Sequence, residues 1–262
     1  MLDDSFERRF GGIARLYGRV ALTRFRAAHV CVIGVGGVGS WAAEALARSA
    51  IGHITLIDLD DICVSNTNRQ LPAHDGNFGR MKVAVLAERI RAINPDCRVN
   101  TIEDFITPEN FDEHLNHGYD YVIDAIDSVK TKAALIAACR ARKLPVIMAG
   151  GAGGQTDPTQ IRVDDLARTT QDPLASKVRA MLRREYGFAR GDKKMGVDCV
   201  YSTESLVYPQ SDGSVCAQKP QGDGPTRLDC NGGFGASVCV TGTFGFAAAA
   251  HVLKKLAAHK PG

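Results

Sequence analysis

A glycine-rich turn directly after a short apolar run constrains this chain more than any other feature. The run Val30-Cys31-Val32-Ile33 leads into Gly34-Val35-Gly36-Gly37-Val38-Gly39, and a helical pattern covers 38–49. Glycine permits the tight turn from strand to helix, and it lets the backbone approach phosphate oxygens, which the unpaired N–H groups of a helix N-terminus attract. The same spacing serves dinucleotide sites and also occurs by chance, so alone it predicts only a phosphate-binding unit.

The order of the apolar segments predicts the fold class. After a helical N-terminus, strands are expected over 29–34, 53–58, 97–103, 119–124 and 145–149, and helices over 38–49, 79–93 and 129–142. Such alternation is typical of a Rossmann-like, doubly wound and mainly parallel α/β sheet. We expect a single domain over 1–262, with a nucleotide-binding half of about 1–150. The second half, about 151–262, would bind substrate and close the site, with further strands at 160–163, 197–201 and 206–208.

Four polar residues favour ATP over a dinucleotide. Asp58 ends the second strand, nineteen residues after Gly39, where a carboxylate can accept hydrogen bonds from a ribose. Arg69 and Lys82 supply the cations that a triphosphate needs, both for its own charge and for the charge on departing pyrophosphate. Asp127 follows strand 119–124 at the carboxyl edge of the sheet, where its oxygens could hold Mg²⁺. An isolated Arg or Lys is usually a solvated surface charge, so the prediction depends on the ordered set.

The ordered set resembles a known superfamily. It comprises Gly34-x-Gly36-Gly37-x-Gly39, Asp58-x-Asp60, Ser65-Asn66-Thr67-Asn68-Arg69-Gln70, Gly79-x-x-Lys82 and Asp127-Ser128, and it is similar to the adenylating enzymes that activate ubiquitin and sulfur-carrier proteins. Three further stretches, 9–18, 150–161 and 208–215, resemble one branch of that superfamily, the tRNA threonylcarbamoyladenosine dehydratases. The resemblance extends from about residue 6 to residue 255, which is nearly the whole chain.

The resemblance implies a set of site residues. Contacts to ATP would fall on Gly34, Gly36, Gly37, Gly39, Asp58, Asp60, Ser65, Asn66, Asn68, Arg69, Lys82, Asp127 and Ser128. Catalytic roles are implied for Arg69, Lys82 and Asp127, with Mg²⁺ held by Asp127. The superfamily also implies a homodimer in which Arg9, or alternatively Arg15, of one subunit reaches the ATP of the other.

The resemblance further implies a reaction, the ATP-dependent cyclisation of N6-threonylcarbamoyladenosine in tRNA through an acyl-adenylate. Two alternatives from other classes remain open at this point. One is an adenylating activator of a ubiquitin-like or sulfur-carrier protein, and the other is an NAD(P)-binding Rossmann protein, against which Arg69 and Lys82 argue. A sulfur-relay or redox protein partner also stays open.

The eight cysteines do not follow a metal-binding pattern. No Cys-x-x-Cys pair occurs in the sequence, whereas many sulfur-carrier activators hold zinc with two such pairs, so no zinc is expected. We expect most of the cysteines to be reduced and buried. Cys199 and Cys230 have polar neighbours and are the candidates for a reactive thiol, although a buried or bystander role is the favoured interpretation because reactivity needs a lowered pKa.

One segment carries the excess positive charge of the chain. Between Ser176 and Lys194, seven basic residues face two acidic ones, which gives +5 against a net +3 for the whole chain. Leu174, Val178, Met181 and Leu182 have helical spacing, which predicts an amphipathic helix with a basic outer face. That face is either simply solvated or a contact for the phosphates of tRNA. Tyr186 and Phe188 could stack on a base, although packing is the more common role.

The last notable segment is a nearly uncharged run over 234–253, which has about the length of a bilayer span. Its glycines and threonines and His251 favour a buried helix of the core or a dimer interface, with membrane association as the alternative. The acidic start Met1-Leu2-Asp3-Asp4 lacks the features of a secretory signal, so a cytoplasmic location is expected.

Overall fold

The computed structural model describes residues 4–210, 212–217 and 234–258. Its strands are β1 (His29–Ile33), β2 (His53–Ile57), β3 (Arg98–Ile102), β4 (Tyr121–Asp124), β5 (Val146–Ala149), β6 (Ile161–Asp165), β7 (Asp198–Ser202), β8 (Tyr208–Pro209) and β9 (Val215–Cys216). Its helices are α1 (Asp4–Tyr17), α2 (Arg19–Ala27), α3 (Gly39–Arg48), α4 (Lys82–Ile93), α5 (Phe111–Leu115), α6 (Val129–Ala141), α7 (Pro173–Glu185) and α8 (Val238–Ala258), with single 3₁₀ turns at Val64–Asn66, Pro108–Asn110, Pro158–Gln160 and Leu166–Arg168.

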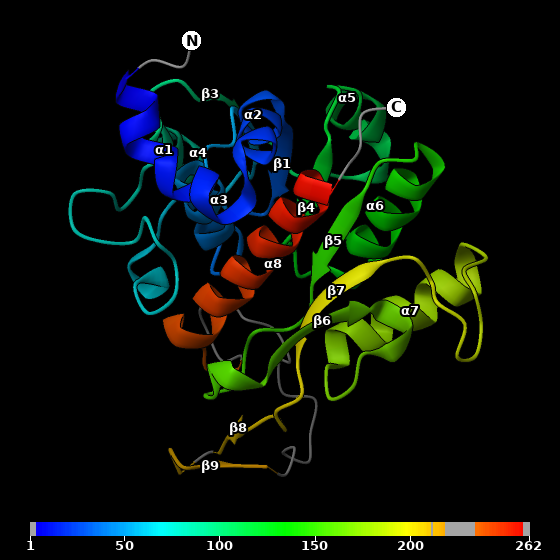
Figure 1. The fold of residues 1–262 in the computed structure, drawn as a ribbon. Coiled ribbons are helices and arrows are strands. Elements are labelled where there is room, and N and C mark those ends of the chain that lie inside the picture. The colour runs from blue at the N-terminus through cyan, green and yellow to red at the C-terminus, as the bar shows by residue number, and fades with distance from the viewer. Residues whose placement is uncertain (1–3, 211, 218–233, 259–262) are drawn as a thin grey trace.

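Seven strands form one sheet in the order β3-β2-β1-β4-β5-β7-β6. All neighbours are parallel except β6, which pairs antiparallel with β7. The expected doubly wound, mainly parallel α/β fold is therefore confirmed. The second half of the chain extends the same sheet through β7 and β6 (Figure 1).

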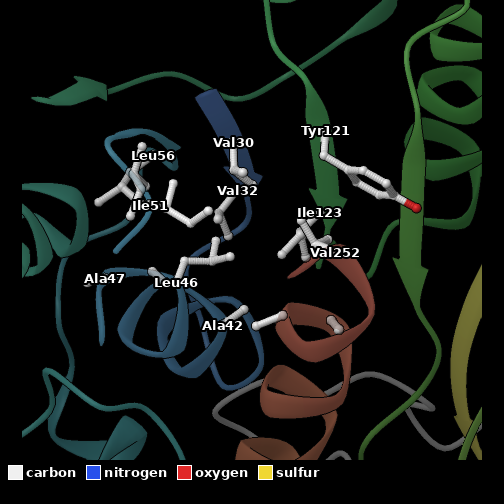
Figure 2. Packing of buried hydrophobic residues seen from close by; sticks show 14 of the residues in the cluster. Val30, Val32, Ala42, Leu46, Ala47, Ile51, Leu56, Tyr121, Ile123 and Val252 are labelled. Atoms are coloured by element: carbon white, nitrogen blue, oxygen red, sulfur yellow. The ribbon is translucent and has the colours of Figure 1, made fainter. Parts of the chain in front are cut away.

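Helices cover both faces of the sheet because successive strand residues point to opposite sides. On one face Val30 and Val32 of β1 pack with α2, α3, α4 and α8. On the other face Cys31 and Ile33 pack with α5 and α6, and α7 lies beside α6. Figure 2 shows the first of these cores, where Leu46 of α3 and Val252 of α8 lie against the side chains of β1 and β4.

The apolar run over 234–253 forms most of α8, which runs across the sheet beside α3 (Figure 1). Phe244, Ala248 and Val252 are fully buried there, as expected for a core helix. Gly245 lies so close to α3 that a Cβ atom would come within 2.5 Å of the carbonyl oxygen of Val38. Within the part of the chain that the structure describes, no helix has the length and the apolar character that a membrane span needs.

Two expected elements differ from the structure. The helix expected over 79–93 begins only at Lys82, because Gly79 has a φ of +80° and Met81 is extended and bridges to Asp61. The strand expected over 206–208 is reduced to the two-residue β8, because the Val207 amide donates to the carbonyl oxygen of Gly154 at 2.9 Å instead of joining the sheet. The other seven predicted strands and the helices predicted over 38–49 and 129–142 agree with the structure to within two residues at each end, whereas α5 and β9 were not predicted.

Candidate nucleotide-binding site

A cavity of about 650 Å³ opens at the carboxyl edge of the parallel strands. The segments that follow the five strands β1 to β5 form its walls, because parallel strands bring these segments to one edge of the sheet. Ten of the thirteen positions implied as nucleotide contacts line it: Gly34, Gly36, Gly37, Asp58, Asp60, Asn66, Arg69, Lys82, Asp127 and Ser128. Residues separated by almost a hundred positions in the sequence thus share one cavity.

The other three implied contacts, and Arg9, lie outside the lining of this cavity. Gly39 packs against the turn, where a Cβ atom would fall 1.9 Å from the carbonyl oxygen of Gly34. The side-chain amide of Asn68 donates to the carbonyl oxygen of Ala236 at 2.8 Å, which ties this segment to the chain before α8. Ser65 is exposed, and Arg9 donates to the carbonyl oxygen of Ile93 at 3.3 Å on the surface.

Asp58 is held at the end of β2 by the backbone. Its Oδ2 accepts from the Val35 amide at 2.8 Å, and its Oδ1 accepts from the Asp60 amide at 2.9 Å. Burial raises the pKa of Asp58, an effect that the charge of Lys82 opposes. A carboxylate fixed in this way beside a glycine turn can accept hydrogen bonds from the ribose of a nucleotide.

The two cations approach the cavity from different elements. Lys82 is the first residue of α4; it is 5% exposed, and its Nζ lies 2.7 Å from Oδ2 of the half-exposed Asp60. Arg69 is more exposed and donates to the carbonyl oxygen of Ser65 and to Oδ1 of Asn68, both at 2.9 Å. Its aliphatic stem lies against Gly37, where a Cβ atom would meet Cγ at 3.3 Å. Both cations therefore line the same cavity as the glycine turn, and Arg69 lies directly against it.

A buried ion pair beneath the cavity was missed by the sequence analysis. Nζ of Lys132 in α6 lies 2.8 Å from Oδ1 of Asp124 and 3.1 Å from its carbonyl oxygen, and both side chains are fully buried. Burial raises the pKa of Asp124, while Lys132 acts in the opposite direction. Asp124 ends β4 and precedes Asp127, so this pair fixes the start of the segment that carries the proposed metal ligand. The sequence signal for this pair was one charged residue inside each of two apolar segments, Asp124 at the end of a strand and Lys132 in a helix.

A second buried carboxylate, Asp172, was also missed. It is 5% exposed and caps α7, since its Oδ1 accepts from the Ala175 amide at 2.8 Å. Its Oδ2 accepts from the amide of Gly151, a cavity residue, at 2.9 Å. A Cβ atom on Gly150 would fall 1.9 Å from the same oxygen, so only glycine fits there. Burial raises the pKa of Asp172.

The cysteines are less uniformly buried than expected. Cys31, Cys97, Cys139 and Cys199 are buried, whereas Cys63 and Cys239 are exposed and Cys216 is partly exposed. Burial raises the pKa of Cys199 well above its usual value, so this thiol is not an activated nucleophile. Cys230 lies outside the described residues. Within the described parts of the chain, no three His, Cys, Asp or Glu side chains are grouped as a metal site would require.

The basic segment forms the expected amphipathic helix, α7, with Val178 and Leu182 buried. Two of its arginines are not free, however, which corrects the expectation of a wholly outward basic face. Arg179 and Arg183 donate to backbone carbonyl oxygens within the protein. Phe188 is also unsuited to stacking on a base, because it is 3% exposed and is covered by the guanidinium of Arg140 at 4.3 Å.

Comparisons with known proteins agree with this geometry. The model of the ThiF family matches residues 12–262. The chain is 61% identical over 259 residues to the tRNA threonylcarbamoyladenosine dehydratase of Escherichia coli strain K12, covering 98% of this chain and 97% of that protein. The protein of the same name from Haemophilus influenzae is 56% identical, with 97% and 95% coverage.

Solved structures extend the likeness to three dimensions. The E. coli tRNA N6-threonylcarbamoyladenosine dehydratase, TcdA, in complex with ATP superimposes with a TM-score of 0.87 at 55% identity. The same enzyme in complex with AMP gives a TM-score of 0.87 at 56% identity. Each comparison covers 98% of this chain and 96% of the other. The chain therefore belongs to the ThiF family, within its branch of tRNA threonylcarbamoyladenosine dehydratases.

Proposed function

We propose that this protein is an ATP-dependent dehydratase that converts N6-threonylcarbamoyladenosine in tRNA to its cyclic form. The observation that carries the proposal is a cavity holding a glycine turn, a fixed carboxylate and two cations, in a chain 61% identical to an enzyme of that name. The ATP and AMP complexes of the related enzyme support ATP as the nucleotide. The proposed location is the cytoplasm.

The proposed chemistry has two steps. A carboxylate oxygen of the threonylcarbamoyl group attacks the α-phosphorus of ATP, and pyrophosphate leaves. The urea-type group of the same side chain then closes on the activated carbonyl carbon and expels AMP, which carries away the former carboxylate oxygen. The two reacting groups belong to one side chain, so ring closure gains the advantage of proximity and needs no enzyme thioester. The raised pKa of Cys199 is consistent with a mechanism that uses no protein thiol.

The arrangement of the cavity suggests a role for each polar group. Asp58 would hold the ribose, and the glycine turn would hold the phosphates. Arg69 and Lys82 would stabilise the charge that moves onto departing pyrophosphate. Lys82 has to exchange Asp60 for a phosphate oxygen, which is feasible because Asp60 is half exposed and can be solvated.

Mg²⁺ would be held by Asp127 together with phosphate oxygens of ATP. Asp127 is exposed at the cavity and belongs to the segment that Asp124 and Lys132 fix from below. One carboxylate with several waters or phosphates is the usual environment of Mg²⁺, so the residues present fit this ion. The bound ion would neutralise charge on the phosphates.

Arg9 is proposed to act in a homodimer by reaching the ATP of the partner subunit. It is exposed on α1 and does not line the cavity of its own chain, which is what an arginine acting across an interface requires. Arg15 is the alternative. Mixed dimers of an Arg9→Ala subunit with a Lys82→Ala subunit should regain part of the activity. Verified mixed dimers without any activity would exclude the role in trans.

The reaction itself is tested with tRNA that carries N6-threonylcarbamoyladenosine. Incubation with the protein, ATP and Mg²⁺ should remove one water from the modified nucleoside, detected by mass spectrometry, with AMP and pyrophosphate formed in equal amounts. Candidate sulfur-carrier and ubiquitin-like proteins serve as competing substrates in an ATP–pyrophosphate exchange assay. Exchange with such a protein, and none with the tRNA, would instead establish an activator of a carrier protein.

A further inference from the structure

The positive charge of the segment Ser176–Lys194 divides into two classes in the structure. The first class is used inside the protein. Arg179 donates to the carbonyl oxygens of Leu166 and Thr169, both at 3.0 Å, and to Oγ1 of Thr169 at 2.7 Å. Arg183 donates to the carbonyl oxygens of Ala189 and Gly191 at 3.0 and 2.7 Å. These two arginines hold neighbouring segments together and are not available to a ligand.

The second class is exposed and has no ion pair or hydrogen bond among the described residues. It consists of Lys177, Arg190, Lys193 and Lys194, which we call the free cation set. Arg184 is intermediate, because it pairs with the adjacent Glu185 at 2.6 Å. The segment carries +5 while the rest of the chain has a net charge of −2, so this surface differs in sign from the remainder of the protein.

The loop that carries three of these cations is held at both ends. At its start the Phe188 amide donates to the carbonyl oxygen of Leu182 at 3.2 Å, and Arg183 binds the loop backbone. At its end the amides of Met195 and Gly196 donate to the carboxylate of Asp165 at 2.9 and 2.7 Å. Three of the four members of the free cation set are therefore presented by a fixed loop, and Lys177 by α7, which lowers the entropy cost of binding an extended polyanion.

Helix α7, which carries Lys177 and precedes this loop, begins at the wall of the nucleotide cavity. The carboxylate of Asp172 accepts hydrogen bonds from the backbone amides of Gly151 and Ala175. Both Gly151 and Leu174 line the cavity. From there α7 extends for 13 residues, a length of roughly 20 Å at 1.5 Å per residue. A molecule lying along α7 can thus contact the free cation set while one of its groups enters the cavity.

We propose that the free cation set is the docking surface for the phosphate backbone of the RNA substrate, an inference that rests on the proposed function. Lysine is depleted in the cores of protein interfaces, which usually present apolar anchors, whereas backbone binding to nucleic acid relies on clustered Lys and Arg. Between residues 173 and 197 the large exposed hydrophobic residue is Tyr186, at 39% exposure, whose ring can stack on an unpaired base. These features favour RNA over an acidic protein.

The test removes charge from the free cation set without touching the structural arginines. In the triple variant Lys177→Gln, Lys193→Gln and Lys194→Gln, Kd for tRNA at physiological salt should rise roughly tenfold or more, and the slope of log K against log salt should fall by about 2. ATP affinity and melting temperature should match wild type. Unmodified tRNA transcript is the probe, measured by fluorescence anisotropy.

Two controls separate a docking role from general effects of charge. The triple variant Arg98→Gln, Lys143→Gln and Lys254→Gln removes the same charge from exposed positions outside this segment, in β3, before β5 and in α8, and should retain the wild-type salt slope. Arg179→Gln should lower the melting temperature and leave the salt slope unchanged, because this arginine binds protein carbonyl groups.

Wild-type affinity and salt slope in the first triple variant would overturn the proposal, as would an equal loss in the control triple variant. If the first triple variant lost affinity for an acidic protein and kept its affinity for tRNA, the surface would be assigned to that protein partner instead. Formation of the cyclic nucleoside by the wild-type protein is measured in the same preparations. If the wild-type protein bound tRNA but did not form the cyclic nucleoside, the proposed function would be contradicted. The assignment of the docking surface would be unaffected by that result.

Discussion

The two edges of the sheet carry polar side chains that are used in different ways. At the carboxyl edge, Lys82 and Asp60 meet at an open cavity, where a ligand can replace one partner of the pair. At the amino edge, His29 and His53, which face each other at the starts of β1 and β2, stack with ring centroids 3.3 Å apart. Here the polar atoms find their partners within the sheet, because Nε2 of His29 lies 2.8 Å from Oγ1 of Thr55 and Nε2 of His53 lies 3.0 Å from the side-chain amide nitrogen of Asn100. The stacked pair therefore belongs to the packing of the sheet.

This difference shows which polar residues can indicate function. Burial alone does not distinguish them, because Lys82 and His29 are 5% and 7% exposed. What distinguishes Lys82 is that its partner is half exposed and both residues line a cavity beside backbone N–H groups. Changes at polar residues that line the cavity should therefore affect turnover, while changes at His29 and His53 should affect stability alone.

The largest effect is expected for the pair that lies at the carboxyl edge but is sealed from the cavity. Lys132→Met leaves Asp124 buried without its partner, so the free energy of unfolding should fall by about 3–5 kcal/mol. The exposed neighbour Lys130 supplies the control, since Lys130→Met should change stability by less than about 0.5 kcal/mol. Urea denaturation of both variants measures the difference. Equal stability of the two variants would mean that the buried pair does not stabilise this edge.

The next effect separates chemistry from stability. Lys82→Ala should lower kcat by roughly 100-fold or more, since removing one preorganised donor to developing charge costs about 3 kcal/mol of transition-state stabilisation. Its melting temperature should stay close to that of wild type, because Asp60 is half exposed and becomes solvated. Turnover of the modified tRNA and thermal unfolding are measured on the same sample. Near-wild-type turnover would remove the assignment of the nucleotide site.

The amino edge should respond to pH through stability. Burial lowers the pKa of His29 from 6.5 to about 4, and burial also lowers the pKa of His53. Below pH 6.5 the unfolded chain binds a proton that the folded His29 does not accept, so stability present at pH 7 is lost as pH falls toward 4. At pH 5 the loss from His29 is about 2 kcal/mol. His29→Gln should flatten this part of the profile of unfolding free energy, and an unchanged profile would contradict the assignment to His29.

Most of the fold could be predicted from the sequence, because it depends on local patterns. Apolar runs of strand length, separated by segments with helical spacing, marked the five parallel strands from β1 to β5, and the glycine turn marked the point where phosphate would bind. The start of α4 was misplaced, because the bridge between Asp61 and Met81 depends on a tertiary contact. Local propensity carries no information on that contact.

The site was predictable where a residue follows a strand, and less so where two distant residues meet. Asp58 and Asp127 could be placed at the carboxyl edge from their positions alone. The contact of Asp172 with Gly151 and that of Lys132 with Asp124 depend on how α6 and α7 pack, which no spacing in the sequence specifies. The charge count of α7 likewise could not separate Arg179, which binds backbone carbonyls, from Lys177, which remains exposed.

The central claim is that the cavity at the carboxyl edge forms an acyl-adenylate on the tRNA side chain. It is tested most directly with modified tRNA whose threonylcarbamoyl carboxylate carries heavy oxygen at both positions. After one round of reaction with unlabelled ATP, the account predicts that AMP contains one heavy oxygen and the cyclic nucleoside retains the other. AMP without label, formed together with the cyclic product, would show that the carboxylate oxygen never bonds to the α-phosphorus, and would contradict the account.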